Sequence, residues 1–344
     1  MLANVRSFFL RNIPESDRSY RGVRVLVLGA TGFIGRWVAR ALSEQGVNLA
    51  VVVRNKRSTE EIFSKYEVDR GSFEVDLIEA DLRDTDSVET VFRHFRPAIT
   101  FNLAGYGIDH SERDETTAYQ INAQLVKVIC EAIANNRDPE WFGQDIIHLG
   151  SVAEYGPIGG NLSETSSECP TTVYGKSKLA GTRWLTHCCQ EFHIKGLTSR
   201  LFTIYGPGEH RGRLLPSLME AALSGKPLSL SAGTQKKDFT YVNDVVEGIL
   251  RLGLVSATRP GEIVNLATGK LTTVRGFAEI AGKILGIPAA NLNFGAISNG
   301  QWDVEHSEIS LERLRRLTGW VPPTSIEQGI RKTANFEGGT GVPK

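Results

Sequence analysis

A glycine-rich turn between an apolar strand and a helix is the feature that most restricts what this chain can fold into. Residues 23–28 (VRVLVL) are apolar and largely β-branched, which predicts a buried strand, and the segment GATGFIG follows directly at 29–35. Residues 37–42 then keep the apolar spacing of a helix, and Gly46 supplies a stop signal. Residues 23–46 are therefore expected to form a strand–turn–helix unit.

The turn has the properties of a pyrophosphate site. Gly29 allows a tight turn, Gly32 lets the backbone approach a phosphate, and Gly35 permits close packing of helix on strand, while the helix N-terminus attracts the anion. A glycine-rich turn without a ligand is the alternative. We expect the following residues to contact a dinucleotide: Gly29, Thr31, Gly32, Phe33, Ile34 and Gly35.

Strands and helices continue to alternate, which predicts an α/β fold with a doubly wound, parallel, Rossmann-type sheet. Further strands are expected at 49–53, 73–79, 98–103 and 146–149, and further helices at 85–95 and 115–134. After residue 200 prolines break up the segments, with helices expected at 214–223 and 274–285. We divide the chain into an N-terminal extension (1–22), a cofactor-binding domain (23–200), a smaller irregular substrate-binding region with excursions back to that domain (201–335) and a flexible tail (336–344).

The end of the second strand indicates the cofactor. NAD-binding units usually carry an acidic residue there for the adenosine ribose, whereas this chain has Arg54, Lys56 and Arg57. Arg54 and Arg57 can pair with a 2′-phosphate, which favours NADP(H) over NAD. A solvated basic loop is the alternative, and NAD then remains the cofactor.

Two further segments are expected to meet the cofactor. Asp81 follows the third strand, where it could hold the adenine amino group while Leu82 packs on the ring; the alternative is a helix N-cap, for which Asp84 is the better candidate. Small residues close the fourth strand where a cofactor would cross it: Leu103, Ala104 and Gly105.

Composition excludes several classes of protein. The 344 residues suffice for about two domains, and 39 basic residues balance 39 acidic ones, so a nucleic-acid or anionic-membrane binder is not indicated. No apolar run approaches the roughly 20 residues that cross a bilayer. The four cysteines lack metal-site spacing and a disulfide framework, so we expect a cytoplasmic protein without a metal site. Residues 7–10 (SFFL) are read as part of an extra arm rather than a signal sequence.

A tyrosine and a lysine stand at positions i and i+4 in YGKSK, after Ser151 at the end of a predicted strand. With these residues the sequence resembles the extended short-chain dehydrogenase/reductases, the nucleotide-sugar epimerases, dehydratases and reductases. The resemblance spans about residues 23–333. The matching segments are GATGFIG (29–35), DL (81–82), NLAG (102–105), SVAEYG (151–156), YGKSK (174–178), RLFTIYGPG (200–208), KDFTYVNDV (237–245), NLATG (265–269) and LTGWVP (317–322).

The resemblance implies a Ser–Tyr–Lys centre. An ammonium at Lys178 would lower the pKa of Tyr174 and hold the nicotinamide ribose, so Tyr174 becomes the general acid/base. Ser151 would hydrogen-bond the same substrate oxygen and orient it. Tyr174 and Lys178 are thus expected to take part in the reaction and to contact the cofactor. The resemblance also implies a homodimer formed through the helices near 115–134 and 174–188.

Departures from the family pattern indicate the reaction. The dehydratases have an Asp-Glu pair immediately after the residue that corresponds to Ser151, and this chain has Val152 and Ala153 there. Elimination of water is therefore disfavoured, although Glu154 lies one residue further on and could replace the missing acid. The basic segment at 54–57 favours a reductase that exchanges NADP(H) over an epimerase that retains NAD.

The substrate side departs from the family as well. Thr203 stands where asparagine is usual, Lys237 where arginine is usual, and a further arginine expected near Gly300 is missing. Lys237 can still meet a diphosphate as a point charge. Arg211 and Arg213 are candidate replacements, as is Arg200, for which a structural role is equally favoured. We expect Ser151, Thr203, Arg211, Arg213 and Lys237 to bind the substrate.

The sequence leaves three alternative functions. The first is an NADPH-dependent reductase of a nucleotide-linked 4-keto-6-deoxysugar, with hydride delivered to C4. The second is an NAD-dependent nucleotide-sugar 4-epimerase. The third is a non-catalytic Rossmann-type cofactor sensor.

Overall fold

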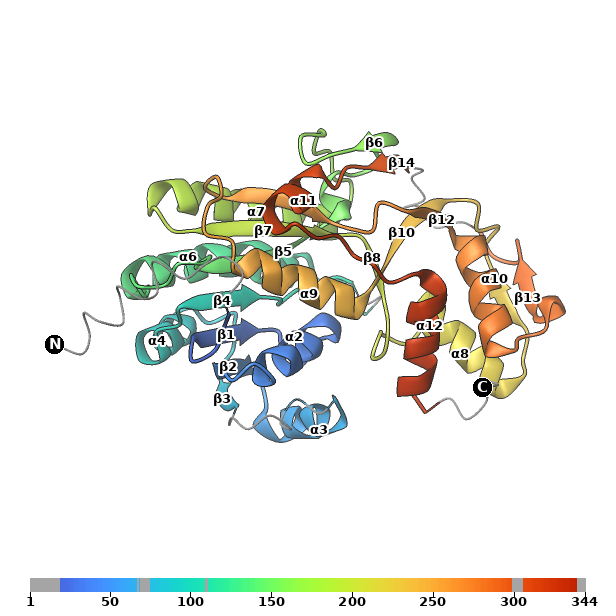
Figure 1. Cartoon of the computed structure of the whole chain (residues 1–344), viewed down its shortest axis with the longest axis horizontal. Helices are drawn as coiled ribbons and strands as arrows, with labels where there is room; N and C mark the ends of the chain where they lie inside the picture. Colours follow the sequence, from blue (N-terminus) through green and yellow to red (C-terminus); the bar gives the residue numbers. More distant parts are fainter. Residues whose placement is uncertain (1–18, 67, 69–74, 109–110, 299–305, 339–344) are drawn as a thin grey trace. The chain divides into compact units, whose positions relative to one another are not determined.

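The computed structural model describes residues 19–66, 68, 75–108, 111–298 and 306–338, and the chain divides into two compact units (Figure 1). Unit 1 contains the described parts of Met1–Glu154, Pro170–Arg200 and Ile249–Val264. Unit 2 contains those of Tyr155–Cys169, Leu201–Gly248 and Asn265–Lys344. The arm expected at residues 7–10 and most of the expected tail lie outside the described residues.

Unit 1 is built on a seven-stranded sheet, and this confirms the predicted Rossmann-type α/β fold. The strand order is β11-β7-β5-β4-β1-β2-β3, and β1 pairs in parallel with both β2 and β4. Figure 1 shows β4, β1, β2 and β3 following one another across the sheet. The strands are β1 (Arg24–Leu28), β2 (Asn48–Val53), β3 (Asp76–Glu79), β4 (Ile99–Asn102), β5 (Ile146–Ser151), β7 (Gly196–Leu201) and β11 (Glu262–Leu266).

The sheet is buried on both faces, as expected for parallel strands flanked by helices. Leu26 and Leu28 join an apolar cluster with side chains of the helices that pack side by side on this face, while Val25 and Val27 are buried on the opposite face. The helices of unit 1 are α2 (Phe33–Ser43), α3 (Lys56–Tyr66), α4 (Thr85–Phe95), α5 (Glu115–Tyr119), α6 (Leu125–Asn136) and α7 (Val173–Glu191), with α4, α6 and α7 forming the layer on the leucine face.

Short sequence signals set the helix boundaries. The side chain of Asp84 accepts a hydrogen bond from Asp86 N and caps α4, so Asp84, rather than Asp81, is the N-cap. Thr172 caps α7 by accepting from Gly175 N at 2.7 Å. These caps fix where the helices that carry candidate site residues begin.

The helix expected over 115–134 is interrupted. A π-helical turn, η2 (Gln120–Gln124), separates α5 from α6, and the whole segment runs to Asn136. The predicted strand at 73–79 is observed as β3, which begins at Asp76, and residues 73 and 74 lie outside the described residues.

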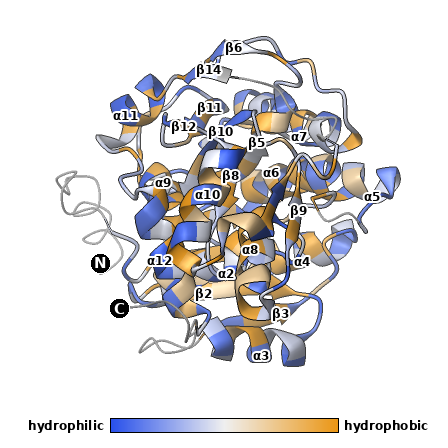
Figure 2. Cartoon of the chain, turned by 90° about the vertical axis from the view of Figure 1, so that its right-hand side faces the viewer, coloured by the Kyte–Doolittle hydropathy of each residue, from blue (hydrophilic) through white to orange (hydrophobic). Residues whose placement is uncertain are grey.

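Unit 2 consists of small sheets and helices. Its sheets are β12-β10-β8, β13-β9 and β14-β6, and β8 pairs in parallel with β10. Helix α8 is largely apolar and appears mostly orange in Figure 2. Tyr205, Phe239 and Tyr241 pack with Phe277 in an aromatic core.

The elements of unit 2 were expected only as two helices and irregular loops. Its strands are β6 (Gly160–Leu162), β8 (Thr203–Tyr205), β9 (Leu228–Leu230), β10 (Lys236–Tyr241), β12 (Leu271–Thr273), β13 (Leu292–Phe294) and β14 (His306–Ile309). Its helices are α8 (Leu214–Ser224), α10 (Val274–Leu285), α11 (Glu312–Thr318) and α12 (Ile326–Phe336), and α9 (Val242–Gly253) continues into unit 1. Among the described residues, no helix is both long and apolar enough to cross a membrane.

Candidate active site

The glycine turn joins β1 to α2 in a geometry that excludes side chains. Gly29 has a φ of 78°, which favours glycine, and a Cβ on Gly35 would overlap the carbonyl oxygen of Gly29. Gly32 caps α2 without a side-chain hydrogen bond, so the first N–H groups of the helix are not covered by a cap. The open backbone and bare helix N-terminus fit the pyrophosphate of a dinucleotide.

Arg36 holds this turn from inside the helix. Its guanidinium donates to the carbonyl oxygens of Thr31 and Gly32, both at 2.9 Å, and lies 4.4 Å from the ring centre of Tyr66. The sequence analysis assigned no role to Arg36, because nothing in the motif shows that a side chain folds back on the turn. These contacts tie α2 to the turn that precedes it.

The segment after β4 runs against the same turn. Leu103 N donates to Leu28 O at 3.0 Å, and a Cβ on Gly29 would lie 2.7 Å from Ala104 N. The structure therefore brings Leu103 and Ala104 beside the expected pyrophosphate site, in the position expected for them.

The basic segment after β2 is exposed. Asn55 caps α3 by accepting from Ser58 N at 2.9 Å, and Arg54, Lys56 and Arg57 are exposed around this helix start. The first turn of α3 contains no acidic residue. The helix dipole and these cations favour negative charge at this end of α3, where Lys56 N already donates to the Glu79 carboxylate at 3.4 Å.

Asp81 is held by its neighbour. Arg83 donates to both carboxylate oxygens, at 2.6 Å for the shortest contact, and lowers the pKa of Asp81 to about 2, with a smaller contribution from Arg54. Leu82 is partly buried against the core. The Asp81 carboxylate is thus ionised at neutral pH and can accept further hydrogen bonds.

Ser151 and the start of α7 are adjacent. Ser151 is the last residue of β5, and α7 packs on β5 and on the 3-10 turn η3 (Val152–Glu154). A Cβ on Gly175 would lie 2.5 Å from Ala153 O, which places the first turn of α7 against the residues that follow Ser151. The ring of Tyr174 lies beside Gly107, 3.3 Å from where a Cβ would be.

Lys178 is buried one helical turn after Tyr174. Its side chain is 3% exposed, and burial lowers the pKa of Lys178 to about 8, while the Glu154 carboxylate acts in the opposite direction. His148 of β5 is fully buried, and its burial and the charge of Lys178 hold the pKa of His148 well below its ordinary value. The lysine one helical turn after Tyr174 is therefore buried near a neutral imidazole.

Asn122 was missed by the sequence analysis. It lies in the π-helical turn and is fully buried, and its Nδ2 donates to Tyr106 O at 2.8 Å and to Ser177 Oγ at 2.9 Å. Tyr106 N donates back to Asn122 Oδ1 at 3.0 Å. The amide ties the segment after β4 to α7. Asn122 stands between the polar residues Gln120 and Gln124, so nothing in the sequence singled it out.

Arg200 and Glu154 form a buried ion pair, which corrects two of the expectations. Arg200 Nε lies 2.8 Å from Glu154 Oε2, and neither side chain is exposed. Arg200 is therefore not a surface group for a diphosphate, and Glu154 is not a free acid that could replace the dehydratase pair.

Of the expected substrate residues, Ser151 lies in unit 1, and Thr203, Arg211, Arg213 and Lys237 lie in unit 2. Thr203 begins β8 and pairs with Phe239 of β10, the strand that also carries the half-buried Lys237. Arg211 and Arg213 are exposed in the loop before α8, and Arg213 Nε lies 3.5 Å from Glu209 Oε1. The position near Gly300 lies outside the described residues.

Glu209 was also missed. Its side chain is only 6% exposed, and burial raises the pKa of Glu209 to about 7, against the opposing charge of Arg213. Its Oε2 has no hydrogen-bond partner within the part of the chain that the structure describes.

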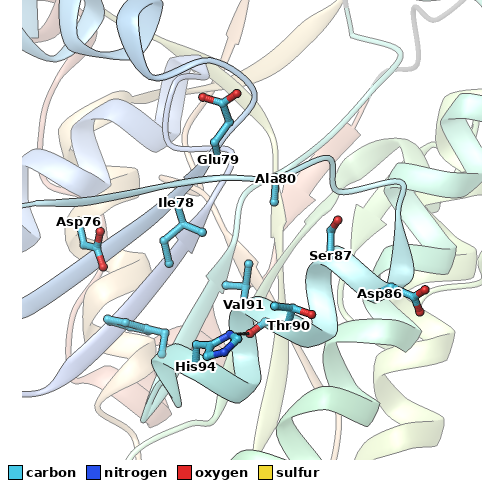
Figure 3. A pocket seen from close by; sticks show the side chains of 10 residues that line it. Asp76, Ile78, Glu79, Ala80, Asp86, Ser87, Thr90, Val91 and His94 are labelled. Carbon is cyan, nitrogen blue, oxygen red and sulfur yellow. Dashed lines mark hydrogen bonds between the residues drawn. The ribbon is translucent and has the colours of Figure 1, made fainter.

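An open pocket of about 540 Å³ lies between β3 and α4 (Figure 3). Figure 3 shows Ile78 and Val91 facing one another at its centre, with Asp76, Glu79 and Asp86 around it. Strands β2, β1 and β4 separate β3 from β5, which carries Ser151. The pocket is acidic and distant from Ser151, so it is not the reaction centre.

Comparisons with known proteins agree with this geometry. Residues 25–267 match the family described as "NAD dependent epimerase/dehydratase family". A dTDP-6-deoxy-L-talose 4-dehydrogenase (NAD(P)(+)) of Kitasatospora kifunensis is 28% identical over 322 residues, which cover 90% of this chain and 94% of that protein. UDP-glucuronate 4-epimerase 1 of Arabidopsis thaliana is 27% identical over 341 residues, covering 90% of this chain and 76% of that protein.

Solved structures share the fold. UDP-glucuronic acid 4-epimerase from Bacillus cereus, in complex with UDP-glucuronic acid and NAD, superposes with a TM-score of 0.78 at 22% identity and covers 91% of this chain and 98% of that one. The family match extends over most of the chain and confirms the resemblance drawn from the motifs. This protein therefore belongs to the NAD-dependent epimerase/dehydratase family, the extended short-chain dehydrogenase/reductases, and is an NAD(P)-dependent enzyme of the nucleotide-sugar group.

Proposed function

We propose that this protein is an NADP(H)-dependent 4-ketoreductase of a nucleotide-linked 6-deoxysugar. The observation that carries the proposal is the state of the residues after Ser151. Val152 and Ala153 are apolar, and Glu154 is buried in its ion pair with Arg200. The chain thus lacks a free carboxylate there for the elimination of water, while the Ser–Tyr–Lys set needed for transfer at a carbonyl is complete.

Each residue of that set has a distinct part in the proposal. When bound, the reduced nicotinamide supplies the hydride that C4 of the sugar receives. Tyr174 donates the proton to the O4 oxygen, so the ketone becomes an alcohol. Ser151 hydrogen-bonds the same oxygen and orients the carbonyl. The Lys178 ammonium, one turn along the helix, stabilises the tyrosinate left behind.

The preference for NADP(H) is supported by the start of α3. Arg54 and Arg57 are exposed there, beside a helix N-terminus whose first turn has no acidic residue. A 2′-phosphate carries the negative charge that both features favour. The turn at Gly29–Gly35 would hold the pyrophosphate.

The substrate class is supported by the relatives. The dehydrogenase at 28% identity is described as acting on dTDP-6-deoxy-L-talose with NAD(P)(+), and a 4-dehydrogenase is a 4-ketoreductase run in the oxidative direction. We infer that Thr203, Arg211, Arg213 and Lys237 of unit 2 contribute to binding the nucleotide diphosphate.

A nucleotide-sugar 4-epimerase is the second candidate. It is favoured by the UDP-glucuronate 4-epimerase at 27% identity. Such an enzyme would use the same Tyr174 and Lys178 to oxidise and re-reduce C4 without net consumption of the cofactor.

Absorbance at 340 nm distinguishes the candidates. The purified protein is mixed with NADPH or NADH and a panel of dTDP- and UDP-linked 4-keto-6-deoxysugars, and separately with UDP-glucose and UDP-glucuronic acid without added cofactor. The proposal predicts oxidation of NADPH with a 4-keto sugar and deuterium at C4 of the product when the cofactor is deuterated at its reactive position. Interconversion of UDP-sugars without added cofactor would establish the epimerase instead, and no turnover with any substrate would favour a cofactor sensor.

A further inference from the structure

Glu154 contacts three elements around the proposed centre through a single carboxylate. Ser151 N donates to its Oε1 at 2.8 Å. Thr182 Oγ1 of α7 donates to its Oε2 at 2.9 Å, and Arg200 Nε of β7 donates to the same oxygen at 2.8 Å. The side chain is fully buried, so these contacts are not exchanged for water.

We propose that Glu154 is a positioning residue that fixes the backbone at Ser151 and acts as the counter-charge of the Lys178 ammonium, with Arg200 holding the carboxylate in place. This inference rests on the proposed function, because it assigns Ser151 and Lys178 to the reaction. It assigns no contact with substrate or cofactor to Glu154.

The backbone contact bears directly on Ser151. Ser151 is the last residue of β5, where the chain leaves the sheet and enters the turn η3. Ser151 Oγ lies 3.2 Å from Ala153 N and accepts from it, so the serine side chain is positioned by the same short turn that Glu154 holds closed. A shift of this turn would move the hydroxyl that orients the substrate oxygen.

The Glu154 carboxylate also lies beside the part of α7 that carries Lys178, because its Oε2 accepts from Thr182, one helical turn after that lysine. Burial of an ammonium favours its neutral form, and a carboxylate nearby opposes that tendency. Glu154 is the group that raises the pKa of Lys178 against the lowering caused by burial. Because the pKa of Lys178 is about 8, loss of the carboxylate would increase the fraction of neutral lysine near neutral pH.

The other charged groups around α7 do not replace Glu154. His148 of β5 faces Lys178 but is held neutral by its own burial and by the lysine charge. Arg200 of β7 has the same sign as Lys178. On the side where α6 packs against α7, Lys127 lies over the ring of Trp184, and the free thiols of Cys130 and Cys188 hydrogen-bond. Trp184 and Cys188 lie further along α7 than Lys178.

The sequence does not reveal this arrangement. Glu154 was considered only as a substitute for a catalytic acid, since it follows Ser151 closely. In the ion pair, Glu154 does not react with the substrate. It instead positions Ser151 and favours the charged form of Lys178. The pairing partner, Arg200, is distant in the chain and could not be inferred from spacing.

The experiment measures the lysine directly. Protein labelled with ¹³C at the lysine ε-carbons is titrated by NMR without substrate or cofactor, and the Lys178 signal is assigned by its loss in Lys178→Arg. Glu154→Gln is expected to lower the pKa of Lys178 by about one unit or more, which is a tenfold change in proton affinity or larger. The matched control is Asp145→Asn, which removes another buried carboxylate just before the other end of β5 and should leave Lys178 unchanged.

A second variant guards against misfolding. Glu154→Gln leaves Arg200 buried without its partner, so Glu154→Met with Arg200→Met removes both charges together. The double variant leaves no unpaired buried charge and should fold, and its Lys178 pKa should lie between those of the wild type and Glu154→Gln, because it also removes the positive charge of Arg200. An unchanged Lys178 pKa in both variants would overturn the inference, whatever reaction the enzyme catalyses.

Steady-state kinetics completes the test. In Glu154→Gln the upper pH limb of kcat should move to lower pH together with the Lys178 titration, with KM for the cofactor changed less than kcat. A lowered Lys178 pKa in a protein that turns over no nucleotide sugar would leave the role of Glu154 as counter-charge intact and overturn the proposed function instead.

Discussion

Arg200 Nε and Glu154 Oε2 lie 2.8 Å apart, and neither side chain has any exposed surface. The pair links β7 to the turn that follows β5, beneath the proposed reaction centre. Buried pairs of this kind stabilise a protein little compared with apolar residues, but removing one partner leaves an uncompensated charge.

This pair gives a prediction on stability. Arg200→Met alone should lower the free energy of unfolding by about 3–5 kcal/mol, because the Glu154 carboxylate remains buried without its partner. Adding Glu154→Met should restore only part of that loss, because Ser151 N and the Thr182 hydroxyl then lose their acceptor. Urea unfolding of the two variants measures both values, and equal destabilisation of the single and double variants would contradict the expectation.

The tyrosine gives a prediction on catalysis. Tyr174→Phe removes the proton donor and should lower kcat by about 10²–10⁴-fold. NADPH binding, measured by fluorescence titration, should change little, since the ring remains beside Gly107. Turnover at the wild-type rate in Tyr174→Phe would exclude this residue as the general acid.

The basic segment gives a prediction on cofactor choice. Arg54→Asp should raise KM for NADPH by about tenfold or more, because a charge-assisted contact with phosphate contributes roughly 1.5–3 kcal/mol. KM for NADH should change much less. Lys65→Asp, at the other end of α3, is the matched control for a general change in charge. Equal effects of Arg54→Asp on the two cofactors would show that Arg54 does not contact the 2′-phosphate.

Glu209 gives a prediction on pH. Burial raises its pKa from 4.5 to about 7, so between these values the folded protein holds a proton that the unfolded chain has released. Stability therefore falls as the pH rises from about 4.5 to 7 and loses nothing more from this group above that range. Glu209→Gln should be more stable than the wild type at pH 8, by about 1–3 kcal/mol, and nearly equal at pH 4.5. Thermal unfolding at both pH values measures the difference, and a constant offset would contradict the assignment.

Local patterns predicted most of unit 1. The strand at 23–28, the glycine turn and the apolar spacing after it depend on neighbours in the chain, and the observed β1 and α2 follow them. Tyr174 and Lys178 share a helix face by their spacing, but their expected role came from the resemblance to the family. Local patterns therefore predicted where residues lie along a strand or helix.

Partners from distant strands were not predictable. Glu154 and Arg200 are brought together by β5 and β7, which are neighbours in the sheet. No spacing rule joins them, and each residue alone resembles an ordinary surface charge. Unit 2 was poorly predicted because its strands β8, β9 and β12 are only three residues long, too short for a periodic pattern.

The π-helical turn at Gln120–Gln124 determines what the deletion of one residue would do at this place in the chain. A π turn absorbs one residue more than an α-helical turn, so the helices on either side keep the faces that they would show in a regular helix. Loss of a single residue from this turn would not prevent the sheet and both helices from forming, but it would displace or remove the Asn122 amide that joins Tyr106 to Ser177. The hydrogen bonds of Asn122 therefore depend on the number of residues in this turn. Neither the hydrophobicity nor the helix propensity of the segment shows this dependence.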